Sequence, residues 1–292
     1  MCDQDAFEAM SQYQLGGATV SRRGFGALAL GAGVLSVLPA AAAGTEMREA
    51  EVEIQTADGT ADAYFVHPAQ GTHPAVLVWP DIFGLRPAFR QMGRRLAESG
   101  YAVLVVNPFY RQQKAPTAPE HPDFNDPELR SRLMGMMTSL TQEMGFTDGK
   151  AFVAWLDQQP AVDKKRKVGT TGYCMGGALT MRTAAAVPAR VGAGASFHGG
   201  GLVTEKPDSP HRLIAKMKAH YLVAIAANDD EKEPQAKDTL RQAFADAKLP
   251  AEIEVYSGTK HGWCPIDSQV YNPEQAEHAW ARLLVLLKSA LA

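Results

Sequence analysis

The chain has 292 residues, of which 46% are hydrophobic and 21% are charged, and its formal net charge is −3. These proportions indicate an ordinary folded protein of one large or two small domains. The small net charge gives no reason to expect nucleic acid or an anionic membrane as a partner.

The N-terminal part of the chain has the pattern of an export signal. Arg22 and Arg23 stand in a Ser-Arg-Arg-Gly-Phe sequence, an apolar stretch covers 27–38, and small residues follow over 39–44. These are the three parts of a signal peptide, and the paired arginines resemble the twin-arginine type. We therefore expect residues 1–43 to engage the twin-arginine export machinery and to be removed. The mature chain is then expected in the periplasm, without stable membrane association.

Strands and helices alternate along the rest of the chain. We expect strands at 51–55, 63–66, 75–79, 101–106, 168–173, 191–197, 221–227 and 253–256, and helices at 89–99, from 126, at 148–158, 175–186 and 234–247, and from 272 to about 291. Residues 112–125, rich in proline and polar side chains, are expected to form a surface excursion. This alternation predicts a single α/β domain over 47–292, with a mainly parallel, doubly wound sheet and helices on both faces.

The most informative segment is 168–179, in which a strand turns sharply into a helix at Cys174. Gly172 precedes the cysteine by two residues and Gly176 follows it by two. This is the pattern of a nucleophile elbow, which needs small residues around a tight turn. The backbone N–H of Met175 would then lie at a helix N-terminus and could stabilise an oxyanion. The other interpretation is a buried structural cysteine in a glycine-rich turn.

Two further strand ends supply an acid and a base. One strand leads into Asp229 and Asp230, and the next leads to His261. Functional groups gather at strand ends in parallel sheets, and the order Cys, Asp, His is the nucleophile–acid–base order of the α/β-hydrolases. His261 would take the thiol proton, and an Asp would hold the imidazole. The remaining histidines of this region are expected to be solvated: His198, His211 and His220.

These features resemble the dienelactone hydrolase family, also called the carboxymethylenebutenolidases, over essentially the whole mature chain. The resemblance is carried by Gly172-Tyr173-Cys174-Met175-Gly176-Gly177, Asp81-Ile82-Phe83-Gly84-Leu85, Lys260-His261-Gly262 and Asn107-Pro108-Phe109-Tyr110-Arg111. It implies an α/β-hydrolase fold and an enzyme that cleaves a lactone or small carboxylic ester through a thioester intermediate. The sequence has no Gly-x-Gly-x-x-Gly motif after a strand and no compact cluster of metal ligands, so we expect neither a cofactor nor a metal. The alternative function is a non-catalytic periplasmic binding protein on the same fold.

The resemblance also implies a role for individual residues. Cys174 matches the nucleophile and His261 the base, and Ile82 and Met175 match the residues whose backbone N–H groups form the oxyanion hole. For the acid, the spacing to Pro234 favours Asp230, and Asp229 remains the alternative. The residues that could hold a substrate carboxylate are Arg111, which has the clearest positional match, and Arg130 and Arg132, which are ambiguous.

Two positions raise questions of their own. Asp81 stands where the family commonly has a glutamate that contacts the resting thiol, and aspartate is one methylene shorter. We therefore expect His261 to activate Cys174, with Asp81 either close to the thiol and substrate or acting as a turn residue. Cys264 follows His261 by three residues. In an oxidising compartment it would either pair with Cys174 or remain a thiol.

Overall fold

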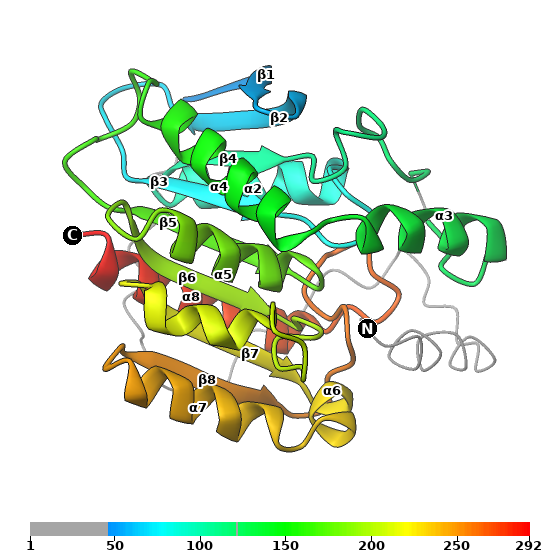
Figure 1. The fold of residues 1–292 in the computed structure, drawn as a ribbon. Coiled ribbons are helices and arrows are strands. Elements are labelled where there is room, and N and C mark those ends of the chain that lie inside the picture. Colours follow the sequence, from blue (N-terminus) through cyan, green and yellow to red (C-terminus); the bar gives the residue numbers. More distant parts are fainter. Residues whose placement is uncertain (1–45, 121) are drawn as a thin grey trace, which may run out of the picture.

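The computed structural model describes residues 46–120 and 122–292 (Figure 1). The expected export signal, residues 1–43, lies outside the described residues. Among the helices that are described, none combines the length and the apolar character needed to cross a membrane.

Eight strands of the described chain form one sheet, in the order β1-β2-β4-β3-β5-β6-β7-β8. Strand β1 (Met47–Thr56) pairs antiparallel with β2 (Gly59–Pro68), and β2 pairs antiparallel with β4. All other neighbours are parallel: β4 (Ala102–Val106), β3 (Ala75–Trp79), β5 (Val168–Tyr173), β6 (Val191–Phe197), β7 (His220–Ala226) and β8 (Ala251–Tyr256). The expectation of a mainly parallel sheet is confirmed.

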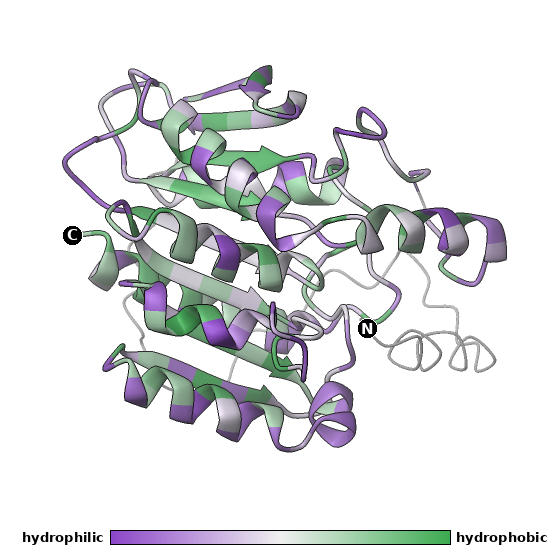
Figure 2. Ribbon diagram, in the orientation of Figure 1, coloured by the Kyte–Doolittle hydropathy of each residue, from purple (hydrophilic) through white to green (hydrophobic). Residues whose placement is uncertain are grey.

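Helices cover both faces of this sheet (Figure 1). One layer consists of α2 (Pro87–Glu98) and α8 (Pro273–Ala290), and the other of α4 (Gln142–Leu156), α5 (Gly176–Ala186), the 3₁₀ helix η1 (Pro210–Lys216) and α7 (Ala236–Asp246). Strands β3 and β4 are buried on both faces and are among the most continuously hydrophobic ribbons in Figure 2. Burial of such strands between two helix layers removes apolar surface from water on both sides, which is the main force that stabilises the domain.

Helix starts follow from local side-chain capping. Asp126 accepts hydrogen bonds from the backbone N–H groups of Glu128 and Leu129 at the start of α3 (Pro127–Thr138), as its sequence predicts. Helix α4 begins at Gln142, earlier than the expected start at 148, because the Thr141 side chain accepts from the Met144 N–H. An N-cap of this kind stabilises a helix by about 1 kcal/mol.

The segment between β7 and α7 differs from the expectation. No helix was expected between the strand at 221–227 and the helix at 234–247, whereas Ala227–Lys232 forms the short helix α6. Both α3 and α6 lie at the end of the sheet where the parallel strands finish, on the right of Figure 1. The direction in which each α6 side chain points is therefore set by helical rotation, and this decides which aspartate reaches His261.

Candidate active site

A cavity of about 60 Å³ opens at the carboxyl ends of the parallel strands. Cys174, directly after β5, and His261, on the segment after β8, both line it. Its apolar wall includes Phe83, Phe124 and Val270. Phe124 belongs to the segment expected to be a surface excursion, yet it is buried and packs edge-on against Phe83, with ring centroids 5.9 Å apart. That excursion therefore returns to form part of the cavity.

The backbone at Cys174 has the strained geometry of a nucleophile elbow. Cys174 has a φ of 54°, in the left-handed region that residues other than glycine rarely adopt. A Cβ atom at Gly172 would lie 2.2 Å from the carbonyl oxygen of Gly176, and one at Gly176 would lie 2.5 Å from the carbonyl oxygen of Trp79. The flanking glycines are therefore required by the close approach of strand and helix. Strain of this kind persists at functional sites, where the surrounding packing imposes it.

His261 is held from two directions. Its Nδ1 lies 2.7 Å from Asp229 Oδ2, and its backbone N–H donates to Asn228 Oδ1 at 2.8 Å. His261 is 4% exposed, and burial by itself lowers its pKa, but the charges of Asp229 and Cys174 outweigh burial and raise the pKa well above the ordinary 6.5. The imidazole therefore lies between a carboxylate on one side and the Cys174 sulfur on the other, an arrangement that favours an imidazolium.

The expectation that Asp230 partners His261 is wrong. Asp230 forms an ion pair with Lys237, at 2.7 and 2.9 Å, and Asp229 occupies the position beside His261. The physical reason is the helix α6: successive residues of an α-helix point about 100° apart, so the two aspartates cannot face the same side chain. Asp229, left open as the alternative, is the residue that contacts the histidine.

His198 is a residue of the site that the sequence analysis placed in solvent. It follows β6 with a φ of 41°, is 1% exposed and lines the cavity. Its Nδ1 accepts a hydrogen bond at 3.1 Å from the backbone N–H of Cys174, which also donates to the Phe197 carbonyl oxygen at 3.0 Å. The ring proton of His198 therefore lies on Nε2. Its ring packs edge-on against His261, with centroids 5.1 Å apart. Burial, and then the neighbouring charge of His261, lower the pKa of His198 well below 6.5 and keep it neutral.

The other two histidines expected in solvent are half-buried. His211 lies with its Nδ1 2.8 Å from Ser209 Oγ, and His220 is the first residue of β7. Neither lines the cavity. The signal for His198 in the sequence was its place directly after a wholly buried strand that lies between the strands of Cys174 and Asp229.

The two residues expected to form an oxyanion hole both belong to segments that follow strands of the parallel sheet. Ile82 follows β3 and lines the cavity, and Met175 follows Cys174 at the start of α5. Both residues are buried. Within the described residues neither backbone N–H is paired with a backbone carbonyl, so both remain able to donate to a ligand.

Asp81 lines the cavity, but its carboxylate is bonded to Arg86 rather than to the thiol. The Arg86 guanidinium donates to both Asp81 oxygens, at 2.6 and 3.0 Å, and to both Asp267 oxygens, at 2.7 and 3.0 Å. Burial acts to lower the pKa of Arg86, and the two carboxylates raise it above its ordinary value. The sequence analysis did not single out Arg86, whose partner Asp267 is 181 residues away in the chain.

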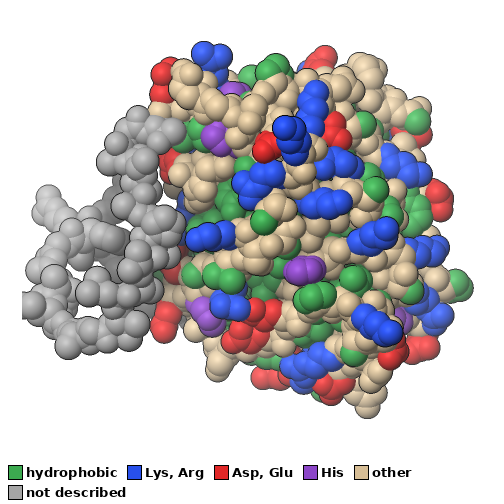
Figure 3. Space-filling view, turned by 90° about the vertical axis from the view of Figure 1, so that its left-hand side faces the viewer, with side chains coloured by type: hydrophobic (Ala, Val, Ile, Leu, Met, Phe, Trp, Pro, Cys, Tyr) green, Lys and Arg blue, Asp and Glu red, His purple; other side chains and the backbone are tan. Residues whose placement is uncertain are grey.

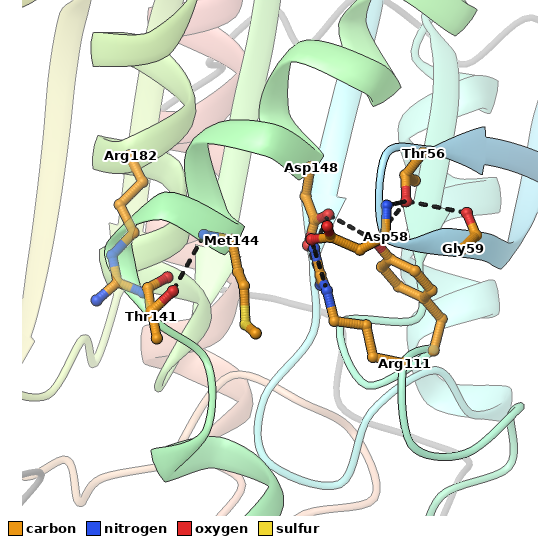
Figure 4. A network of polar contacts seen from close by, with 9 residues as sticks. Thr56, Asp58, Gly59, Arg111, Thr141, Met144, Asp148 and Arg182 are labelled. Atoms are coloured by element: carbon orange, nitrogen blue, oxygen red, sulfur yellow. Dashed lines mark hydrogen bonds and ion pairs between the residues drawn. The ribbon is translucent and has the colours of Figure 1, made fainter.

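Arg111 is also in a different place from the one expected. It does not line the cavity; its guanidinium lies between Asp58 and Asp148, with N–O distances of 2.6 to 3.0 Å (Figure 4). These carboxylates come from the β1–β2 turn and from α4. The arginine therefore ties two parts of the fold together and does not contact a substrate in this cavity. Arg130 and Arg132, on α3, do not line the cavity either.

The two cysteines of the described chain are free and buried. Cys174 lines the cavity of the candidate site, whereas Cys264 lines a separate cavity of about 240 Å³, together with Tyr173 and Trp280. Burial raises the pKa of the Cys264 thiol well above its ordinary value, which keeps this thiol protonated and unreactive. Over the described residues no cluster of three or more His, Cys, Asp or Glu side chains could hold a metal ion.

The sheet order and the elbow define an α/β-hydrolase fold, and the comparisons give the family. The model of the dienelactone hydrolase family matches residues 61–291, and the chain belongs to this family. The carboxymethylenebutenolidase of Pseudomonas sp. strain P51 is 30% identical over 230 residues, covering 79% of this chain and 90% of that protein. The family thus supports a lactone or ester hydrolase.

Solved structures support the fold. A dienelactone-hydrolase-like promiscuous phosphotriesterase from metagenomic libraries has a TM-score of 0.69 at 22% identity, covering 84% of this chain and 99% of that chain. A dienelactone hydrolase from Anabaena variabilis has a TM-score of 0.61 at 16% identity, covering 84% and 99%. At these identities the likeness shows a shared α/β-hydrolase fold.

Proposed function

We propose that this chain hydrolyses small carboxylic esters or lactones through a thioester on Cys174. The observation that carries the proposal is the pairing of His261 Nδ1 with Asp229 at 2.7 Å, in a cavity that the elbow cysteine also lines. A nucleophile, a base that it can reach and a group that orients the base are the three parts of covalent acyl transfer.

The reaction proceeds in two halves. The Cys174 thiol gives its proton to His261, which the site favours as an imidazolium, and the resulting thiolate attacks the ester carbonyl carbon. The carbonyl electrons move to an oxyanion beside the N–H groups of Ile82 and Met175. The oxyanion collapses, the C–O bond to the leaving alcohol breaks, and His261 returns the proton to that alcohol. Water then attacks the thioester, giving up a proton to His261. The carboxylic acid leaves, and the proton returns to the sulfur.

His261, rather than Asp81, activates the thiol in this proposal. The carboxylate of Asp81 is bonded at both oxygens to Arg86, so it is not free to act as a base toward sulfur. Asp229 stabilises the imidazolium that forms when His261 accepts a proton. His198 remains neutral and holds the Cys174 backbone through its Nδ1.

The test is the turnover of 4-nitrophenyl esters of short acids, and of dienelactone, by the purified protein without its first 43 residues. The wild type should show saturable turnover with at least one of these substrates. Cys174→Ala and His261→Ala should each lose at least a hundredfold in kcat/KM, whereas the surface variant Asp238→Asn should match the wild type. Full activity in Cys174→Ala would refute the proposal. An inactive wild type that binds these esters would favour the binding protein considered in the sequence analysis.

We propose further that residues 1–43 direct export of the folded protein to the periplasm by the twin-arginine machinery. The support is the ordered pattern of paired arginines, apolar stretch and small residues. The full-length protein should appear in the periplasmic fraction with a new N-terminus near Gly44. A variant with Arg22→Lys and Arg23→Lys together should remain uncleaved in the cytoplasm, and equal export of both forms would refute this route.

A further inference from the structure

The charged groups around the cavity have an excess of negative charge. Three of the described lining residues are aspartates, Asp81, Asp123 and Asp267, and Arg86 is the one Lys or Arg among them. Lys and Arg side chains are instead numerous on the opposite side of the molecule, where the parallel strands begin (Figure 3). When the His261 imidazolium is counted as a cation beside Arg86, the described lining still has three carboxylates and two cations.

Arg86 has no donor left for a substrate. A guanidinium has five N–H groups. The bonds of Arg86 number five as well: two reach Asp81, two reach Asp267, and the fifth reaches the Gly84 carbonyl oxygen at 3.4 Å. Its planar faces are also in contact, with the ring centroids of Phe83 and Phe89 at 5.4 and 4.9 Å. With one cation between two carboxylates, this Arg86 cluster has a formal net charge of −1; Arg86 and Asp81 are buried, whereas Asp267 lies at the surface.

Arg111, which has the clearest positional match for a substrate-binding arginine, is also occupied. Arg111 lies outside the cavity, with Asp58 and Asp148 on its guanidinium. Ile82, Phe83 and Phe124 give the cavity of about 60 Å³ an apolar wall, and the uncharged polar residues Asn125, Ser268 and Gln269 also line it. A short apolar acyl group fits against the apolar wall. A carboxylate in the same place would lose its hydration without a free Lys or Arg in the described lining to pair with it, and the aspartates would repel it.

We infer that the substrate of this enzyme has an uncharged acyl group, and that the cavity discriminates against esters and lactones that carry a carboxylate. This inference rests on the proposed hydrolase function and names the substrate class of that site. Under this inference, no arginine of the cavity binds an acid group of the substrate.

The test compares two esters that differ only in charge: mono(4-nitrophenyl) glutarate, and the same ester with its free carboxylate replaced by a carboxamide. The wild type should have a kcat/KM about tenfold higher, or more, for the uncharged ester at low ionic strength. The ratio of kcat/KM for the uncharged ester to kcat/KM for the anionic ester should decrease in high salt, because ions screen the repulsion at the exposed rim of the cavity.

Two variants identify the groups responsible. Asp267→Asn retains an oxygen that can accept from Arg86 but removes one negative charge, so it should raise the relative kcat/KM of the anionic ester about threefold or more. Asp123→Asn, at an exposed position, should also raise the relative kcat/KM of the anionic ester. This variant does not alter the Arg86 cluster, so it tests the inference even if Asp267→Asn folds poorly. Asp238→Asn, which lies on α7 and does not line the cavity, should leave the ratio unchanged.

The outcomes separate the two proposals. Equal kcat/KM for both esters in the wild type, or a preference for the anion, would overturn the inference while leaving the hydrolase function in place. Turnover of neither ester above the rate of Cys174→Ala would overturn the hydrolase function, and the inference with it.

Discussion

Replacing Asp229 by asparagine should remove most of the activity while leaving the shape of the site intact. The Asp229 carboxylate lies 2.7 Å from His261 Nδ1, and both side chains are largely buried. Their charge centres are about 4 Å apart, which at an effective dielectric constant of about 20 corresponds to about 4 kcal/mol of attraction for an imidazolium. Each 1.36 kcal/mol is about a tenfold change in rate, so Asp229→Asn should lose about 10²- to 10³-fold in kcat/KM.

The assay is 4-nitrophenyl ester hydrolysis with Asp230→Asn as the matched control. Asp230 belongs to the same short helix, but its partner is Lys237 at a partly exposed position. Such pairs contribute about 0–1 kcal/mol, so Asp230→Asn should keep kcat/KM within about threefold of the wild type. An equal loss in both variants, or a loss confined to Asp230→Asn, would refute the assignment of Asp229 as the partner of His261.

Asp229→Asn should also change how the free energy of unfolding depends on pH. Asp229 and Cys174 raise the pKa of His261 above 6.5, so the protonated imidazole stabilises the folded state fully below pH 6.5. That contribution is lost as the pH rises through the raised pKa of the folded state. The unfolding free energy of the wild type, measured in urea, should therefore fall over that range. Asp229→Asn should show a smaller fall that ends at a lower pH, because the carboxylate no longer raises the pKa of His261 in the folded state.

Two further variants test the other residues of the site. His198→Ala removes one of the two acceptors of the Cys174 N–H, a hydrogen bond worth about 1 kcal/mol, and should lower kcat up to about fivefold. The basic limb of the pH–rate profile should stay where it is, since His198 is neutral, and a displaced limb would contradict its role in positioning. Arg111→Gln leaves the buried Asp148 with only Tyr110 as a side-chain partner and should destabilise the fold by about 3 kcal/mol in thermal or urea unfolding. The folded Arg111→Gln protein should keep the KM of the wild type for uncharged and anionic esters, and a raised KM for the anion alone would restore Arg111 as a substrate contact.

Much of the architecture could be predicted from the sequence because its signals are local. The central strands are short apolar runs buried on both faces, and the helices α3 and α8 begin with Asp-Pro and Asn-Pro caps that need no tertiary information. The elbow at Cys174 was also local, since two glycines at fixed offsets are required by the close approach of β5 and α5.

The parts that could not be predicted depend on distant residues. Arg111 is neutralised by Asp58, 53 residues earlier, and by Asp148, 37 residues later, so its position in a family-like segment did not reveal its partners. The choice between Asp229 and Asp230 depended on the rotation of α6, a helix without any buried residue to mark its inner face. The burial of His198 could not be predicted either, because a single histidine in a glycine-rich segment has no periodicity that would indicate burial.

The most direct test of the central claim is the mass of the enzyme during turnover. The protein without its first 43 residues is mixed with a short-chain 4-nitrophenyl ester, quenched in acid within the first turnovers, and examined by intact-mass and peptide mass spectrometry. The thioester account predicts one acyl group per chain, located on the peptide that contains Cys174 and absent from Cys174→Ala. Acylation of another residue, or steady turnover by Cys174→Ala with the same adduct, would contradict it.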